Sequence, residues 1–124
     1  MIKIYYRMGC GSSRRALAWF QTYGIEVQQQ RVDKLTKEDL IKLLSLSDEG
    51  TSEVLKCASR SSSNVNKMLN HIMELSFNEA LDFILEHPIM LQAPLILDEN
   101  KHLIGYNDDE IRMFLPKKYR RHNF

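Results

Sequence analysis

The chain has 124 residues and a mass of 14.6 kDa, a size that fits one domain. Hydrophobic residues make up 44% and charged residues 27%, which excludes a disordered chain or a fibre. The net charge of +1 excludes a nucleic-acid binder that acts through a large overall positive charge. No apolar run reaches the roughly 20 residues that span a bilayer, and the first residues lack a signal-peptide pattern, so we expect a cytoplasmic protein.

The first third of the sequence predicts two strands joined by a helix. Residues 2–6 are rich in β-forming side chains and stop before a glycine-rich turn. Ser12 or Ser13 is a typical N-cap for the following helix, and Gly24 is a typical residue for its end. Residues 25–31 alternate apolar and polar side chains, which indicates a second strand. Because a helix connects them, we expect these strands to be parallel.

The middle of the chain contains helical patterns and no convincing strand. A capping sequence at Thr36 precedes apolar residues on one face, and we expect this helix to end at Gly50. Further helices are expected over residues 52–58, 65–69 and 77–86. We therefore predict a helical insertion over residues 36–87, which follows a first core segment of residues 1–35.

The last third returns to strands. Residues 94–97 and 102–106 flank a polar turn and predict an antiparallel hairpin. A final helix follows and ends at Pro116, so residues 88–116 complete the core. Residues 117–124 form a basic C-terminal tail. Its cations are Lys117, Lys118, Arg120 and Arg121.

The element order β-α-β, helices, β-β-α predicts an α/β, thioredoxin-like fold with a helical subdomain inserted between its halves. In that fold a cysteine turn opens the first helix and faces a proline that begins the third strand. Cys10 and Pro94 occupy these two positions in the sequence. We therefore expect a cis peptide bond before Pro94.

Cys10 is the best candidate for reactive chemistry. Its thiol precedes a helix N-terminus, where backbone N–H groups and the helix dipole favour an anion, so we expect a lowered pKa. Arg7, Arg14 and Arg15 lie nearby and add positive potential. The residue three positions after Cys10 is Ser13, so a C-x-x-C disulfide cannot form. The alternative is that Cys10 is a buried thiol in a structural turn.

The other cysteine and the histidines point to no further chemistry. We interpret Cys57 as a small buried hydrophobe in the insertion, and a Cys10–Cys57 bridge stays open as an alternative. The four histidines lack the spacing of metal ligands, so we expect neither a metal nor a cofactor. They are His71, His87, His102 and His122.

One stretch of sequence is especially specific. Residues 105–116 read Gly-Tyr-Asn-Asp-Asp-Glu-Ile-Arg-Met-Phe-Leu-Pro, which is hard to obtain by chance. This stretch resembles the Spx proteins of the arsenate-reductase-like family. The same resemblance extends over nearly the whole chain, to about Arg121. It includes residues 4–10, 15–20, 48–50, 87–88 and 94–99.

The resemblance implies a transcriptional regulator that binds the C-terminal domain of the RNA polymerase α subunit in the stress response. It implies that Gly50 contacts that subunit, together with the turn of Cys10, Gly11, Ser12 and Ser13. The alternative role of Gly50 is only to end a helix. Spx proteins usually carry a C-x-x-C switch, which this chain lacks. We expect a monomer in the free state, and contact with DNA only indirectly or through the basic tail.

The alternative function is that of an arsenate reductase. Residues 10–14 read Cys-Gly-Ser-Ser-Arg, close to that enzyme's Cys-Gly-Thr-Ser-Arg, in which a thiolate attacks arsenate before glutathione and glutaredoxin act. The resemblance puts Arg60 near the first of three anion-binding arginines. Ala93 stands where the second belongs, and the third has no replacement. Because a doubly charged oxyanion needs several arginines, we expect no enzymatic activity. Arg14 and Arg60 stay as candidates for stabilising the thiolate or an anion.

Overall fold

The computed structural model describes residues 1–116, so the predicted basic tail lies outside the described residues. These residues form a four-stranded sheet in the order β2-β1-β3-β4. The parallel pairing of β1 with β2 and the antiparallel hairpin of β3 and β4 confirm the predicted topology. β1 also pairs with β3 in the antiparallel direction. The strands are β1 (Ile2–Tyr6), β2 (Val27–Arg31), β3 (Leu95–Leu97) and β4 (His102–Ile104).

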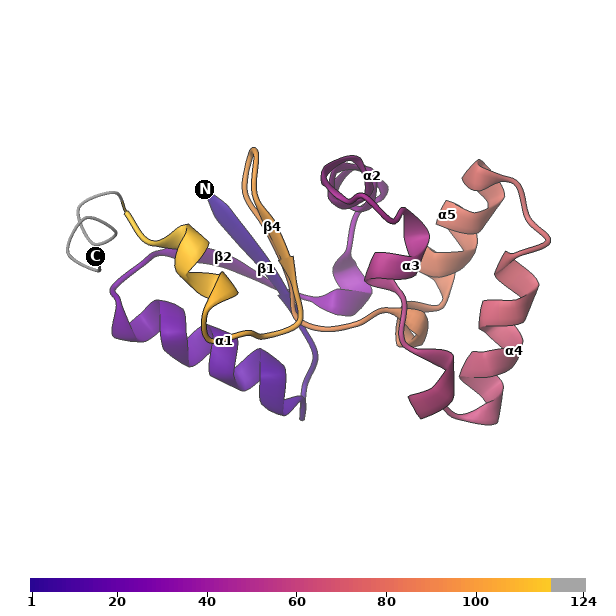
Figure 1. The fold of residues 1–124 in the computed structure, drawn as a ribbon, viewed down its shortest axis with the longest axis horizontal. Coiled ribbons are helices and arrows are strands. Elements are labelled where there is room, and N and C mark those ends of the chain that lie inside the picture. Colours follow the sequence, from indigo (N-terminus) through magenta and orange to yellow (C-terminus); the bar gives the residue numbers. More distant parts are fainter. Residues whose placement is uncertain (117–124) are drawn as a thin grey trace.

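One face of the sheet is covered by helix α1 (Gly11–Thr22) and the 3₁₀ helix η4 (Glu110–Phe114). Ile4 lies opposite Ile96 in the β1–β3 pairing, and both side chains are fully buried. They pack in one cluster with Phe20 of α1 and with residues of η4. Figure 1 shows α1 and η4 together at one end of the molecule.

The other face of the sheet packs against the helices of the middle segment. Tyr5, Leu95 and Leu97 alternate with the residues of the first cluster, so their side chains point to this second face. They share one core with side chains of the middle helices, which gather at the opposite end from α1 (Figure 1). The helices are α2 (Lys37–Leu46), α3 (Thr51–Val54), α4 (Ser63–Ile72) and α5 (Phe77–Glu86), with the 3₁₀ helices η1 (Val32–Lys34), η2 (Ala58–Arg60) and η3 (Pro88–Met90).

Local capping explains where the middle helices begin. Thr36 caps α2 by accepting a hydrogen bond from the amide of Asp39 at 3.1 Å. Ser76 forms a complete capping box with Glu79 at the start of α5. Both helix starts confirm the sequence prediction. α4 begins at Ser63, two residues before the predicted residues 65–69, because the Ser62 hydroxyl caps it there, and it continues to Ile72.

The helix predicted over residues 52–58 is wrong beyond Val54. Leu55 leaves the helix and forms an antiparallel bridge with Leu91. The amide of Lys56 donates to the carbonyl of Met90, and the amide of Gln92 donates to the carbonyl of Val54, both at 2.9 Å. This pairing with a distant segment replaces the intrahelical bonds that the local pattern predicted.

Three further boundaries differ from the prediction. Cys10, rather than Ser12 or Ser13, is the N-cap of α1, so the thiol itself lies at the helix start. The second strand begins at Val27 rather than at residue 25, because Ile25 still donates its amide to the carbonyl of Phe20. The final helix, expected to end at Pro116, is the short 3₁₀ helix η4, which ends at Phe114.

Candidate functional site

Cys10 lies at the N-terminus of α1, in the turn that leaves β1. The amide of Ser13 donates a hydrogen bond to Cys10 Sγ at 3.5 Å. The thiol faces the carbonyl of Ala93 at 3.8 Å, and the peptide bond between Ala93 and Pro94 is cis. Cys10 is partly exposed, so reagents in solution can reach it. The cysteine turn and the segment that opens β3 therefore form one site.

Ser13 occupies the position that a second cysteine takes in a C-x-x-C motif, and its side chain has its own structural role. It is 1% exposed. Its hydroxyl oxygen accepts a hydrogen bond from the amide of Arg7 at 3.1 Å, and the side chain also bonds to Cys10. Ser13 therefore fixes the turn and stabilises the thiolate without providing a sulfur.

The thiolate form of Cys10 is favoured by its surroundings. Burial raises the pKa of the thiol. Hydrogen bonds from Ser13 and from the Ser12 amide, and the positive charge of Arg7, act in the opposite direction and outweigh it, so the pKa lies below its ordinary value. This agrees with the expectation for a thiol at a helix N-terminus.

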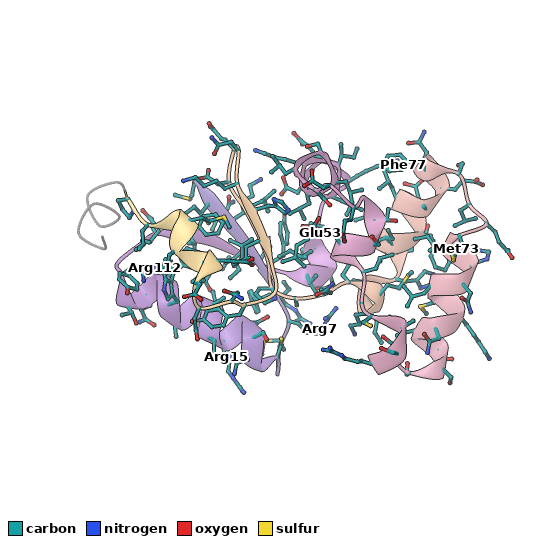
Figure 2. All side chains as sticks on the ribbon, viewed as in Figure 1. Arg7, Arg15, Glu53, Met73, Phe77 and Arg112 are labelled. Carbon is teal, nitrogen blue, oxygen red and sulfur yellow. The ribbon has the colours of Figure 1, made fainter. Side chains whose placement is uncertain are left out.

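Arg7 joins the cysteine turn to the middle segment. Its guanidinium donates to the carbonyls of Leu91 at 3.0 Å and Pro88 at 2.8 Å. Figure 2 shows Arg7 between the sheet and the helices of the middle segment. The side chain therefore holds η3 and the residues after it against the end of β1 while its charge acts on Cys10.

The positive charges near the thiol agree with the sequence expectation in part, because Arg7 acts on Cys10 as expected. Burial and the charge of Arg7 lower the pKa of Lys56, and the charge of Cys10 raises it, so Lys56 also interacts with the thiol. No interaction described for residues 1–116 joins Arg14 or Arg60 to Cys10. Their role as anion-stabilising residues stays a prediction.

Cys57 is exposed, so its interpretation as a buried hydrophobe is wrong. Its sulfur lies 3.1 Å from the hydroxyl oxygen of Ser59. Hydrogen bonds from Ser59, aided by the charge of Arg60, lower the pKa of Cys57. Both cysteines are free thiols, so a Cys10–Cys57 bridge is absent from the described residues.

Gly50 lies in the connection between α2 and α3, away from the cysteine turn in the sequence. α2 ends at Leu46 with Ser47 as its C-cap, so the expectation that Gly50 ends this helix is wrong. Gly50 instead precedes α3 with φ 66° and ψ −141°, a conformation that only glycine adopts readily. Apart from Gly50 and its two chain neighbours, no described residue has a heavy atom within 4 Å of the place that a Cβ would take. The space beside the backbone is therefore open here.

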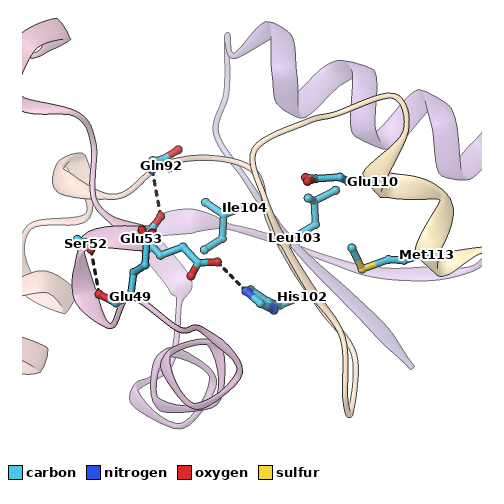
Figure 3. A pocket seen from close by; sticks show the side chains of 9 residues that line it. All are labelled: Glu49, Ser52, Glu53, Gln92, His102, Leu103, Ile104, Glu110 and Met113. Carbon is cyan, nitrogen blue, oxygen red and sulfur yellow. Dashed lines mark hydrogen bonds and ion pairs between the residues drawn. The ribbon is translucent and has the colours of Figure 1, made fainter.

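A pocket of about 550 Å³ opens beside the Gly50 connection. Two residues that line it are in contact: Oε1 of Glu53 in α3 and Nε2 of His102 in β4 are 2.7 Å apart (Figure 3). Sequence reasoning missed this contact and the carbonyl contacts of Arg7, because each joins residues that are far apart in the chain. The pocket is lined by Glu49, Ser52, Glu53, Gln92, His102, Leu103, Ile104, Glu110 and Met113.

Two classes of site are absent from residues 1–116. No group of three or more His, Cys, Asp or Glu side chains lies close enough together there to hold a metal ion. Within the same residues no helix has both the length and the apolar character needed to cross a membrane.

The overall shape is similar to that of solved proteins with low sequence identity. An ArsC family related protein from Bacteroides fragilis aligns with a TM-score of 0.74 at 18% identity, over 90% of this chain and 95% of that protein. An arsenate reductase from Vibrio cholerae aligns with a TM-score of 0.66 at 19% identity, over 90% and 92%. These likenesses show the thioredoxin-like fold and carry no information about activity.

The sequence comparisons are more specific. The family model of the ArsC family matches residues 5–114. A global transcriptional regulator Spx from Lactiplantibacillus plantarum is 38% identical over 97% of this chain and 90% of its own length. Global transcriptional regulator Spx 1 of Lactococcus lactis is 37% identical over 98% and 94%. These relatives are regulators rather than enzymes, in agreement with the expected lack of enzymatic activity. The chain therefore belongs to the ArsC family and, within it, to the Spx transcriptional regulators.

Proposed function

We propose that this regulator binds the C-terminal domain of the RNA polymerase α subunit in the cytoplasm and changes transcription in the stress response. The connection at Gly50 supplies the contact surface, and the free protein is a monomer. The carrying observation is the open space around Gly50, whose positive φ presents bare backbone to a partner. A surface of this kind suits a partner that must approach the chain closely.

The turn of Cys10, Gly11, Ser12 and Ser13 extends the contact surface in this proposal. Cys10 is partly exposed and has a lowered pKa, and Ser13 stands where a second cysteine would be, so Cys10 acts as a single-thiol sensor rather than a disulfide switch. Ser13 is buried, so it acts by fixing the turn and not by touching the partner.

The cysteine turn supports the regulator over the reductase. The thiol faces the carbonyl of Ala93, a residue with no charge to hold an oxyanion. Arg60, the one retained member of the arginine set, interacts with Cys57. Arg7 is close to the thiol, but its guanidinium already donates to two carbonyls. The site therefore lacks the converging donors that arsenate chemistry needs.

The test is a binding titration with the isolated C-terminal domain of the α subunit. Gly50→Ala and Gly50→Arg both place a Cβ on a strained backbone, so both carry a similar folding cost. Only arginine adds a long side chain toward the partner. We expect wild type and Gly50→Ala to bind and Gly50→Arg to lose binding, while the two variants melt at similar temperatures. Absence of wild-type binding, or equal binding of both variants, would overturn the proposal.

A further inference from the structure

The connection of residues 47–50, here termed the Gly50 loop, is held by a short network of hydrogen bonds. The hydroxyl of Ser47 donates to Oε2 of Glu53 and accepts from the amide of Glu49 at 3.1 Å. The hydroxyl of Ser52 donates to the carbonyl of Glu49 at 2.9 Å. The amide of Glu53 donates to the carbonyl of Gly50 at 3.3 Å. The conformation of the loop therefore depends on where Glu53 lies.

The sheet fixes the position of Glu53 through one side chain. Nε2 of His102, in β4, lies 2.7 Å from Oε1 of Glu53. Figure 3 shows the Glu53 side chain extending from the helix toward the imidazole of His102 on the strand. The two side chains are 21% and 28% exposed, so water screens the contact only in part. On the other side, the carbonyl of Glu53 accepts from the Gln92 side chain at 3.0 Å.

We infer that His102 is a positioning residue for the Gly50 loop: it holds Glu53, Glu53 holds Ser47, and the loop is thereby kept against the sheet. Where it concerns the partner, this inference rests on the proposed function. Where it concerns the loop itself, it stands on the free protein and is tested there.

The groups in the pocket support this role. Glu53 has a pKa below its ordinary value, because Ser47 and His102 donate to its carboxylate, so it is ionised across the neutral range. Glu49 and Glu110 are the other acidic side chains that line the pocket. An ionised carboxylate only accepts hydrogen bonds, so Nε2 of His102 is the donor that holds Glu53.

The first arm of the test measures amide hydrogen exchange in the free protein, expressed as protection factors so that the intrinsic pH dependence is removed. The amides of Glu49 and Glu53 report on the loop. His102→Leu should lower their protection about tenfold and leave the amides of α1 unchanged. His71→Leu is the matched control, because His71 makes a long, exposed contact of 3.9 Å with Glu74. It should change neither set.

The second arm uses His102→Gln, which keeps an N–H donor without the imidazole ring. It should restore the protection of Glu49 and Glu53 that His102→Leu removes. If His102→Leu disturbs the whole fold, His102→Ala replaces it in this comparison. Equal protection in wild type and the variant without a donor, or no recovery in His102→Gln, would overturn the inference.

The third arm repeats the α-subunit titration with the His102 variants. We expect affinity to follow loop protection, with His102→Leu about tenfold weaker than wild type and His102→Gln close to it. If wild type does not bind, the proposed function fails while the exchange data still judge His102. If wild type binds and His102→Leu binds equally well, the link between His102 and the partner is wrong and the proposed function stands.

Discussion

The hydroxyl of Tyr5 in β1 donates a hydrogen bond to Oδ2 of Asp39 in α2. Asp39 is only 6% exposed, and Lys3 completes its surroundings with an ion pair at 3.2 Å. The amide of Asp39 donates to the hydroxyl oxygen of Thr36, which is the N-cap of α2. One carboxylate thus ties the central strand of the sheet to the first helix of the middle segment, and its burial is tolerated because donors surround it.

Replacing Asp39 by Ala should lower the free energy of unfolding by about 2–3 kcal/mol, because the buried Tyr5 hydroxyl loses its acceptor. Urea denaturation measures this change. Asp82→Ala is the control, since the Lys37–Asp82 pair at 2.9 Å is exposed and should cost less than about 1 kcal/mol. Tyr5→Phe in the Asp39→Ala background should restore part of the loss. Equal effects of the two Asp variants would contradict this role of Asp39.

Tyr5 should also make the protein sensitive to alkali. Burial, followed by the hydrogen bond and charge of Asp39, raises the pKa of Tyr5 to about 12. A raised pKa in the folded state gives stability that is complete below the unfolded value of about 10 and is lost as the pH rises toward 12. Urea midpoints between pH 9 and 11 should therefore fall more steeply in wild type than in Tyr5→Phe. Parallel curves would show that Tyr5 does not contribute.

Cys10 should react as a thiolate at neutral pH, with Ser13 as a main cause. The pKa of Cys10 is lowered, so reactivity should persist below the pH of about 8.5 at which a free thiol half-ionises and be lost only at lower pH. Iodoacetamide rates against pH, followed in a Cys57→Ser background, measure this midpoint. Ser13→Ala should move it upward. Ser12→Ala keeps the backbone amide and should leave it in place, and identical midpoints for both variants would rule out the role of the Ser13 side chain.

Arsenate should not be reduced by this protein. With Ala93 facing the thiol, turnover in the presence of glutathione and glutaredoxin should equal a control without the protein. NADPH consumption through glutathione reductase measures it. Turnover that disappears in Cys10→Ser would show that the protein is an arsenate reductase and would contradict the proposed regulator.

Binding to the α subunit should be independent of reductant. Oxidation of Cys10 ends at a sulfenic acid or a mixed disulfide, because Ser13 supplies no second sulfur. Titrations with and without dithiothreitol should give equal affinities, and Cys10→Ala should bind nearly as well as wild type. A large loss of affinity on reduction would instead indicate a disulfide to Cys57 or between two chains, and Cys57→Ser would distinguish these from an effect of Cys10 alone.

Residues close together in the sequence predicted the elements well. The caps at Thr36 and Ser76 and the end of α1 before Gly24 depend on hydrogen bonds within a few residues, so local patterns are sufficient. The stretch after Val54 was mispredicted because Leu55 takes its partner from Leu91, which no local pattern contains. Helical preference is too weak to resist such pairing.

The candidate site was likewise predictable only where it depends on residues that are neighbours in the sequence. The lowered pKa of Cys10 follows from its place before a helix, which the sequence indicates. The tie from Arg7 to the carbonyls of Pro88 and Leu91 and the contact of Glu53 with His102 join separate parts of the chain. The sequence shows that Arg7, Glu53 and His102 are polar or charged, but only the fold determines which residues they contact.

The pairing of β1 with β3 has a consequence for synthesis on the ribosome. β1 emerges first, but its register places Ile4 opposite Ile96, near the other end of the described chain. During most of translation the nascent protein therefore carries an unfinished sheet edge with buried-type side chains still in water. Such an edge can pair with other chains, so rapid completion of the chain matters more here than in a protein built from neighbouring hairpins. A nascent chain that ends shortly before residue 95 leaves β1 without its β3 neighbour and both hydrophobic clusters incomplete.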